Sequence, residues 1–115
     1  MDKETEKKIQ ELQIIEQNLQ NILMQKQAFQ MELNETENAS LELEKAEDEV
    51  YKIAGQIMIK SSKESLKKEL DEKKHLLSLR LKAIEKQDSP LSEKASRLRE
   101  EIVKKISEEK ADSKK

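Results

Sequence analysis

The sequence predicts a mainly α-helical protein, a long antiparallel two-helix coiled coil whose helices are joined by a central β-hairpin. Apolar residues recur at steps of three and four in both halves of the chain, and an alternating segment with the only glycine separates the halves. Composition agrees with this fold. With 42% charged and 34% hydrophobic residues, a chain of 115 residues cannot build a wide globular core. We therefore expect a single domain over residues 1–115.

The first helix is expected at about residues 5–47. Stepping alternately by three and four residues gives a seam in which most members are apolar, and such a seam has to face another helix. Its members are Leu12, Ile15, Leu19, Ile22, Lys26, Phe29, Leu33, Thr36, Ser40 and Leu43.

The second helix is expected at residues 62–110. Ser61 and Glu64 fit a capping box, in which a hydroxyl and a carboxylate bind the free amides at a helix start. The 3/4 pattern continues here with more polar members and one irregular step after Leu91. The expected seam is Leu66, Leu70, Lys73, Leu77, Arg80, Ile84, Gln87, Leu91, Ala95, Leu98 and Ile102, while Leu76, Leu79 and Leu81 lie off it.

A kink or hinge is expected at residues 88–90. Pro90 has no amide proton and its ring collides with the preceding turn, so an uninterrupted second helix is not expected. Ser89 as N-cap and Pro90 at the first helical position would restart the helix. The alternative is a tolerated bend without functional meaning.

The segment EVYKIAGQIMIK, residues 49–60, predicts a β-hairpin that turns near Gly55, which supplies the positive φ that the turn needs. Strand side chains alternate between two faces, so an odd loop length would gather four large apolar side chains on one face and an even one would separate them. We expect the odd length. The four side chains are Tyr51, Ile53, Ile57 and Ile59.

An isolated two-stranded hairpin is marginal in water, and its edges expose unpaired amides and carbonyls. This hairpin needs further strands, which the chain does not supply. We therefore expect an obligate oligomer in which several copies, or related chains, pool their hairpins into an intersubunit β-barrel. The expected assembly residues are Val50, Tyr51, Ile53, Gly55, Ile57, Met58 and Ile59.

Charge and composition argue against several other function classes. The formal charge of −2 comes from 23 basic and 25 acidic residues mixed along the chain, so no extended positive field for nucleic acid is expected. No cysteine and no apolar N-terminus are present, and the expected location is cytoplasmic, without a membrane partner. His75 has lysine neighbours and is expected at the surface. We expect no enzyme activity, no metal and no cofactor.

The order of a long helix, EVYKIAGQIMIKSSKESLKKEL and a second long helix, with QKQAFQMELNETENAS upstream, resembles the beta-type subunits of the prefoldin family, most of all the archaeal form. The resemblance covers roughly residues 10–108. Its most specific part is V-Y-K-x-x-G-x-x-x-x-K at Val50–Lys60. An alpha-type subunit would have a second hairpin between its helices.

The resemblance implies a hexamer of two alpha-type and four beta-type subunits, with hairpins in β-barrels and coiled coils around a cavity. It also implies an ATP-independent holdase that captures unfolded polypeptides at the coiled-coil tips and passes them to a group II chaperonin. The alternative function is a structural coiled-coil adaptor or scaffold that uses the hairpin to assemble and the helices to bridge fixed partners.

Apolar residues near the free ends of both helices are the expected client-binding residues. A two-helix coil buries one narrow stripe, so surplus apolar groups at its end can contact a client's exposed hydrophobic segments. The alternative is that these residues complete the coil or pack within the oligomer. They are Ile9, Leu12, Ile14, Ile15, Leu98, Ile102, Val103 and Ile106.

Overall fold

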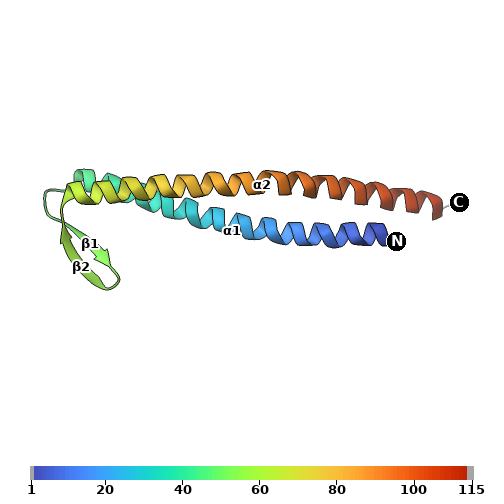
Figure 1. Ribbon diagram of the computed structural model, residues 1–115, viewed down its shortest axis with the longest axis horizontal. Helices are drawn as coiled ribbons and strands as arrows, with labels where there is room; N and C mark the ends of the chain where they lie inside the picture. The colour runs from blue at the N-terminus through green and yellow to red at the C-terminus, as the bar shows by residue number, and fades with distance from the viewer. Residues whose placement is uncertain (1, 114–115) are drawn as a thin grey trace. The chain divides into compact units, whose positions relative to one another are not determined.

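The structure, a computed structural model, describes residues 2–113, which form two long helices and one antiparallel hairpin. The elements in chain order are α1 (Lys3–Lys45), β1 (Val50–Ala54), β2 (Ile57–Ser61) and α2 (Lys63–Ser113). Figure 1 shows the green hairpin beside the end of α1 and the start of α2. The predicted fold of two long helices joined by a central hairpin is confirmed. The helix bounds differ from those expected: α1 begins and ends two residues before the expected range 5–47, and α2 continues past residue 110.

Two compact units make up the chain. One combines the residues up to Gln25 with those from Ile84 onward, and the other is Lys26–Ala83. In each unit a part of α1 lies beside a part of α2, and the two parts run in opposite directions (Figure 1). The hairpin belongs to the second unit.

The first unit is held together by a small apolar core between the distal parts of the helices. Its buried centre is made by Ile15 of α1 with Ala95 and Leu98 of α2. Ala95 is almost completely buried, only 1% exposed. Three half-buried leucines pack against this centre, namely Leu12, Leu19 and Leu91.

The second unit is centred on Leu77 of α2, which is only 1% exposed. Thr36 of α1 is buried in this unit, and its hydroxyl donates a 2.8 Å hydrogen bond to the carbonyl of Glu32, so its polarity is satisfied within the helix. The guanidinium of Arg80 lies 5.7 Å from the centre of the Phe29 ring, a cation–π contact between the helices.

The predicted seam of α1 agrees with the structure, since all ten of its members are buried or half-buried. The predicted seam of α2 is wrong at three positions. Lys73, Arg80 and Gln87 are exposed, whereas the residues that follow them are half-buried, namely Lys74, Leu81 and Asp88. With these replacements the 3/4 repeat runs without an irregular step from Lys74 to Ile102.

Polar side chains cap the starts of both helices. In α1 the amide of Thr5 donates a 2.7 Å hydrogen bond to Asp2 Oδ1. In α2 the cap is Ser62, whose Oγ accepts a 3.1 Å bond from the amide of Ser65. The predicted capping box at Ser61 is therefore wrong by one residue, because Ser61 is still part of β2 and pairs with the first residue of β1.

Helix α2 runs through Pro90 without ending, and the predicted restart with Ser89 as N-cap is wrong. The ring removes one helical hydrogen bond, since Pro90 has no amide to donate. Interactions on both sides of the proline hold the helix together. Ser92 Oγ donates to Asp88 Oδ1 across the proline at 3.3 Å, and Leu91 packs against the core of the first unit.

Candidate functional site

The hairpin exposes most of its apolar side chains. Its strands pair as Val50↔Ser61, Tyr51↔Lys60, Lys52↔Ile59, Ile53↔Met58 and Ala54↔Ile57. This register leaves a two-residue turn, and of its two residues Gly55 alone has a positive φ, of 63°. A positive φ confined to the first central residue is the pattern of a type II′ turn, which matches the twist of two antiparallel strands.

The expectation that four large apolar side chains share one face is wrong. Directly opposed residues of an antiparallel pair lie on the same face, and a loop of even length places Tyr51 and Ile53 opposite residues of even number. Tyr51 and Ile53 therefore share a face with Met58 and Lys60. Ile57 and Ile59 lie on the other face.

The base of the hairpin is tied to the helices of its own unit. Val50 is buried, and Lys52 Nζ forms a 2.9 Å ion pair with Glu69 of α2. Between β1 and the helices lies a groove of about 450 Å³. Its walls come from Tyr51, Ile53 and three apolar helix residues, namely Ala39, Leu66 and Leu70. The outer edge of β1 has no strand partner within residues 2–113, so its main-chain groups are free to pair with another chain.

The eight predicted client-binding residues divide into three groups in the first unit. Ile14 and Val103 are each 63% exposed. Ile9, Leu12 and Ile106 are half-buried. The third group is buried in the helix seam and is not accessible while the coil is closed; its members are Ile15, Leu98 and Ile102.

Ion pairs link α1 to α2 in the first unit, at the coil end that carries the predicted client-binding residues. Lys8 pairs with Glu101 at 3.3 Å, and Asp2 with Lys105 at 3.6 Å. Further along, Lys94 pairs with Glu11 at 2.7 Å. Every partner is at least about one-third exposed, so each pair contributes only about 0–1 kcal/mol. Their main effect is to favour the observed alignment of the two helices.

Asp2 is the one described residue with a resolved change in acidity. Hydrogen bonds from the side chain and then the amide of Thr5 lower the pKa of Asp2 below its ordinary value of 3.8; desolvation opposes this shift, and the charge of Lys105 adds to the lowering. The carboxylate at the start of α1 therefore stays ionised over most of the pH range in which proteins are handled.

Several exposed apolar residues outside the hairpin and the coil end are not among the predicted site residues. They are Leu23, Met24, Met31 and Leu41, all on α1. The sequence carries a signal for them, because none of these four residues belongs to the 3/4 seam of this helix.

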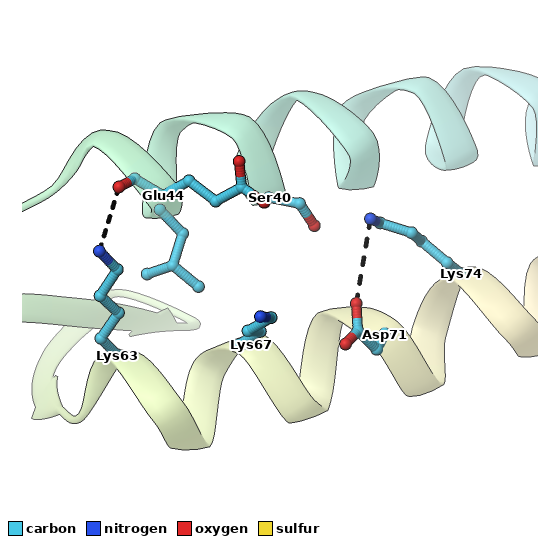
Figure 2. Close-up of a pocket in the computed structure, with 7 residues that line it drawn as sticks. Ser40, Glu44, Lys63, Lys67, Asp71 and Lys74 are labelled. Atoms are coloured by element: carbon cyan, nitrogen blue, oxygen red, sulfur yellow. Dashed lines mark hydrogen bonds and ion pairs between the residues drawn. The ribbon is translucent and has the colours of Figure 1, made fainter.

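A polar groove of about 360 Å³ lies between α1 and α2 beside the hairpin (Figure 2). Its interactions are made within the chain. Lys63 Nζ donates 3.1 Å hydrogen bonds to the carbonyls of Glu44 and Ala46, and Lys74 lies 4.0 Å from Asp71. The hydrogen bonds of Lys63 thus link the end of α1 to the start of α2, which is a structural role.

No group of three or more metal-binding side chains is found in the described part of the chain, and His75 is exposed on α2. Across residues 2–113, neither helix contains a stretch that is both apolar enough and long enough to cross a membrane. The surfaces that stand out are therefore the apolar hairpin and the apolar groups at the coil end.

Comparison with known proteins identifies the family. The family model described as "Prefoldin subunit" matches residues 6–109. The chain belongs to the prefoldin family. It is 39% identical over 95 residues to the prefoldin subunit beta of Pyrobaculum islandicum, with 81% of this chain and 76% of the relative covered. It is 37% identical over 94 residues to the prefoldin subunit beta of Pyrococcus furiosus, with 80% of each chain covered.

A solved prefoldin structure agrees. The crystal structure of the prefoldin beta subunit from Thermococcus strain KS-1 superimposes with a TM-score of 0.81 at 35% identity, covering 88% of this chain and 90% of that chain. The resemblance to archaeal beta-type prefoldin subunits is thus confirmed. Because its relatives are prefoldin subunits, this chain is a chaperone subunit. Prefoldin subunits work in oligomers with other prefoldin subunits.

Proposed function

We propose that this chain is the beta-type subunit of an ATP-independent holdase. It captures unfolded polypeptides at the coiled-coil end formed by the first part of α1 and the last part of α2, and it passes them to a group II chaperonin. The observation that carries this proposal is the exposure of Ile14 and Val103, each 63%, on an end whose seam is already filled. Neither side chain is needed to close the coil.

The energetics suit transient capture. Fully burying one aliphatic side chain contributes about 1.5–3 kcal/mol, so a single coil end holds a client weakly. Several ends that engage one client raise the overall affinity by effective concentration, without any new type of contact. The half-buried Ile9 and Ile106 add further apolar surface at the same coil end.

The proposed assembly is a hexamer of two alpha-type and four beta-type subunits joined through the hairpins. Support comes from the unpaired strand edges and from the exposure of Tyr51, Ile53, Ile57, Met58 and Ile59. In this proposal the hairpins are the strands of an intersubunit β-barrel, and the assembly works in the cytoplasm.

One observation favours the alternative function, a structural adaptor. Three of the eight predicted client-binding residues are buried in the seam, so the coil end is closed and its helices could bridge fixed partners without binding unfolded chains. The two functions differ in whether the exposed apolar residues of the coil end matter.

The test replaces both exposed residues in one chain, Ile14→Ser with Val103→Ser, and assembles it with an alpha-type subunit. Because both positions are exposed, the coil should remain closed and native mass spectrometry should show an unchanged hexamer. The holdase function predicts that the concentration needed to halve the aggregation of a chemically denatured client rises at least tenfold, since about 1.4 kcal/mol corresponds to tenfold.

The matched control is Leu41→Ser, which removes an exposed apolar residue of α1 in the other unit. It should leave suppression of aggregation unchanged. Full suppression by the Ile14→Ser, Val103→Ser protein would contradict client capture at the coil end and support the adaptor.

A further inference from the structure

The polar groove beside the hairpin contains positive charge that the chain does not use. Its volume is about 360 Å³, and three of its lining residues are lysines of α2, namely Lys63, Lys67 and Lys74. Spacings of four and seven residues keep side chains on one side of a helix, so all three lysines border the same groove. The opposite wall comes from the last turns of α1 and includes Ser40.

Of the three lysines, only Lys63 is fully engaged within the chain, through its two bonds to main-chain carbonyls. Lys67 has no hydrogen bond or ion pair among residues 2–113. Lys74 has one contact, to Asp71 at 4.0 Å, which is too long for a hydrogen bond. Its side chain is only 32% exposed, so water compensates this ammonium incompletely. Two ammonium groups in the groove therefore have donors to spare.

Ser40 adds a hydroxyl to the same groove. Its Oγ is buried and makes no hydrogen bond within the part of the chain that the structure describes. Buried polar atoms are nearly always paired, so this hydroxyl is open to a further partner. In Figure 2 the hydroxyl of Ser40 and the ammonium of Lys74 point toward each other across the groove, one from each helix. Rotation about the serine Cα–Cβ bond turns the hydroxyl toward a ligand between them.

The charge of the groove favours an anion. Its three ammonium groups face two carboxylates, those of Glu44 and Asp71, which leaves one net positive charge. Lys63 compensates the negative end of α1, so the remaining positive charge lies at Lys67 and Lys74. Asp71 competes weakly for Lys74, because its side chain is 59% exposed and a long, exposed ion pair contributes little. This carboxylate can turn into solvent when a more highly charged group binds.

The available donors suit a phosphate group. A phosphate monoester near neutral pH carries a charge of about −1.5 to −2 and three strong acceptor oxygens, which matches two ammonium groups and one hydroxyl. Lysine binds phosphate as a point charge, without the planar geometry that arginine requires. A water molecule takes about 30 Å³ in the liquid, so a groove of about 360 Å³ has room for a phosphate group and part of a larger molecule.

We propose that Lys67 and Lys74 of α2, together with the Ser40 hydroxyl of α1, form a binding site for a phosphate group, either as inorganic phosphate or as part of a polyphosphate chain. The bound anion contacts both helices of the second unit. It therefore strengthens the base of the coil beside the link that Lys63 already makes between α1 and α2.

Calorimetric titration of the complex with an alpha-type subunit tests the site. Sodium phosphate and sodium tripolyphosphate are added separately, at an ionic strength held constant with sodium chloride. The test variant is Lys67→Gln with Lys74→Gln. The matched control, Lys68→Gln with Lys82→Gln, removes the same charge from two exposed lysines of α2 outside the groove. Ser40→Ala keeps every charge and removes only the hydroxyl.

The site predicts saturable binding by the unsubstituted chain and by the control. The affinity should fall at least tenfold in the test variant and about tenfold in Ser40→Ala, because a hydrogen bond to a charged group is lost. Tighter binding of tripolyphosphate than of phosphate supports the site with a polyphosphate chain as its ligand, and equal binding supports it with inorganic phosphate. Equal affinity of the test variant and the control refutes the site, as does the absence of saturable binding of either anion together with an unchanged Tm.

Thermal unfolding followed by circular dichroism covers the case in which binding releases little heat. An anion held by both helices raises Tm as its concentration rises, whereas the general salt effect of phosphate acts on every variant alike. The rise should be larger for the unsubstituted chain and the control than for the test variant and Ser40→Ala. An equal rise in all four refutes the site. Failure of client capture at the coil end would leave these results unchanged, since that end belongs to the other unit.

Discussion

The Nζ of Lys63, the first residue of α2, donates a hydrogen bond of 3.1 Å to the carbonyl of Glu44 near the end of α1. The same ammonium donates to the carbonyl of Ala46, also at 3.1 Å. The last carbonyls of a helix have no partner within the helix and carry the negative end of its dipole. One side chain from the start of α2 therefore caps the C-terminus of α1 across the intervening hairpin (Figure 2).

Replacing this lysine by methionine, Lys63→Met, keeps the aliphatic chain and removes the charge and the donors. We expect the free energy of unfolding to fall by about 1 kcal/mol, because two carbonyls lose a charged donor at a partly exposed site. Urea denaturation followed by circular dichroism at one fixed protein concentration measures the change.

The control for this experiment is Lys68→Met, an exposed lysine one turn further along α2 with no ion pair among the described residues. It should change the free energy of unfolding by no more than about 0.5 kcal/mol. Equal effects of the two substitutions would show that the capping bonds do not stabilise the chain.

Leu76 and Leu77 are adjacent leucines with opposite environments, 47% and 1% exposed. Leu77→Ala removes the most deeply buried large side chain of the second unit and should lower the free energy of unfolding by about 2–5 kcal/mol. Leu76→Ala should lower it by about 0.5 kcal/mol or less. Urea denaturation of the purified chain compares the two variants. A similar loss of unfolding free energy in both would contradict the position of Leu77 in the helix seam.

The start of α1 should depend on pH through Asp2. Because the pKa of this carboxylate is lowered in the folded chain, its stabilising effect is fully present above its ordinary value of 3.8 and is lost as the pH falls through the lower, folded value. We expect the amide of Thr5 to lose protection from hydrogen exchange across that acidic range, measured by NMR.

The Asp2→Asn variant separates this effect from the protonation of other carboxylates. Asparagine can still accept the bond from the Thr5 amide but does not titrate. The additional loss of protection should therefore disappear in this variant. A pH profile identical to that of the unsubstituted chain would show that Asp2 is not the titrating group.

Much of this fold follows from local sequence patterns. The seam of α1 is specified because seven of its ten positions in the 3/4 repeat are apolar, and a helix with such a stripe has to bury it. The hairpin was located by its alternation and by Gly55, since few residues adopt the positive φ of this turn. The candidate assembly residues were found for the same reason.

The seam of α2 could not be settled locally, because Leu77, Ile84 and Leu91 belong to two overlapping repeats. These repeats differ only in whether the intervening members are Lys73, Arg80 and Gln87 or their successors, and each choice includes charged residues. Contact with α1 decides between them. Leu91 takes part in this contact next to Pro90, and α2 continues as a helix through the proline, where the local pattern alone predicts a new start.

The sequence by itself determined two amphipathic helices, the place where the chain reverses and the apolar character of the ribbon between them. Only the tertiary structure decided which residues of that ribbon share a face and which apolar groups at the coil end stay exposed. The physical reason is that side chains alternate at every strand residue, so one residue more or less in the turn exchanges the faces of a strand. The exposure of apolar side chains at the coil end likewise depends on how the two helices are aligned, which neither helix determines by itself.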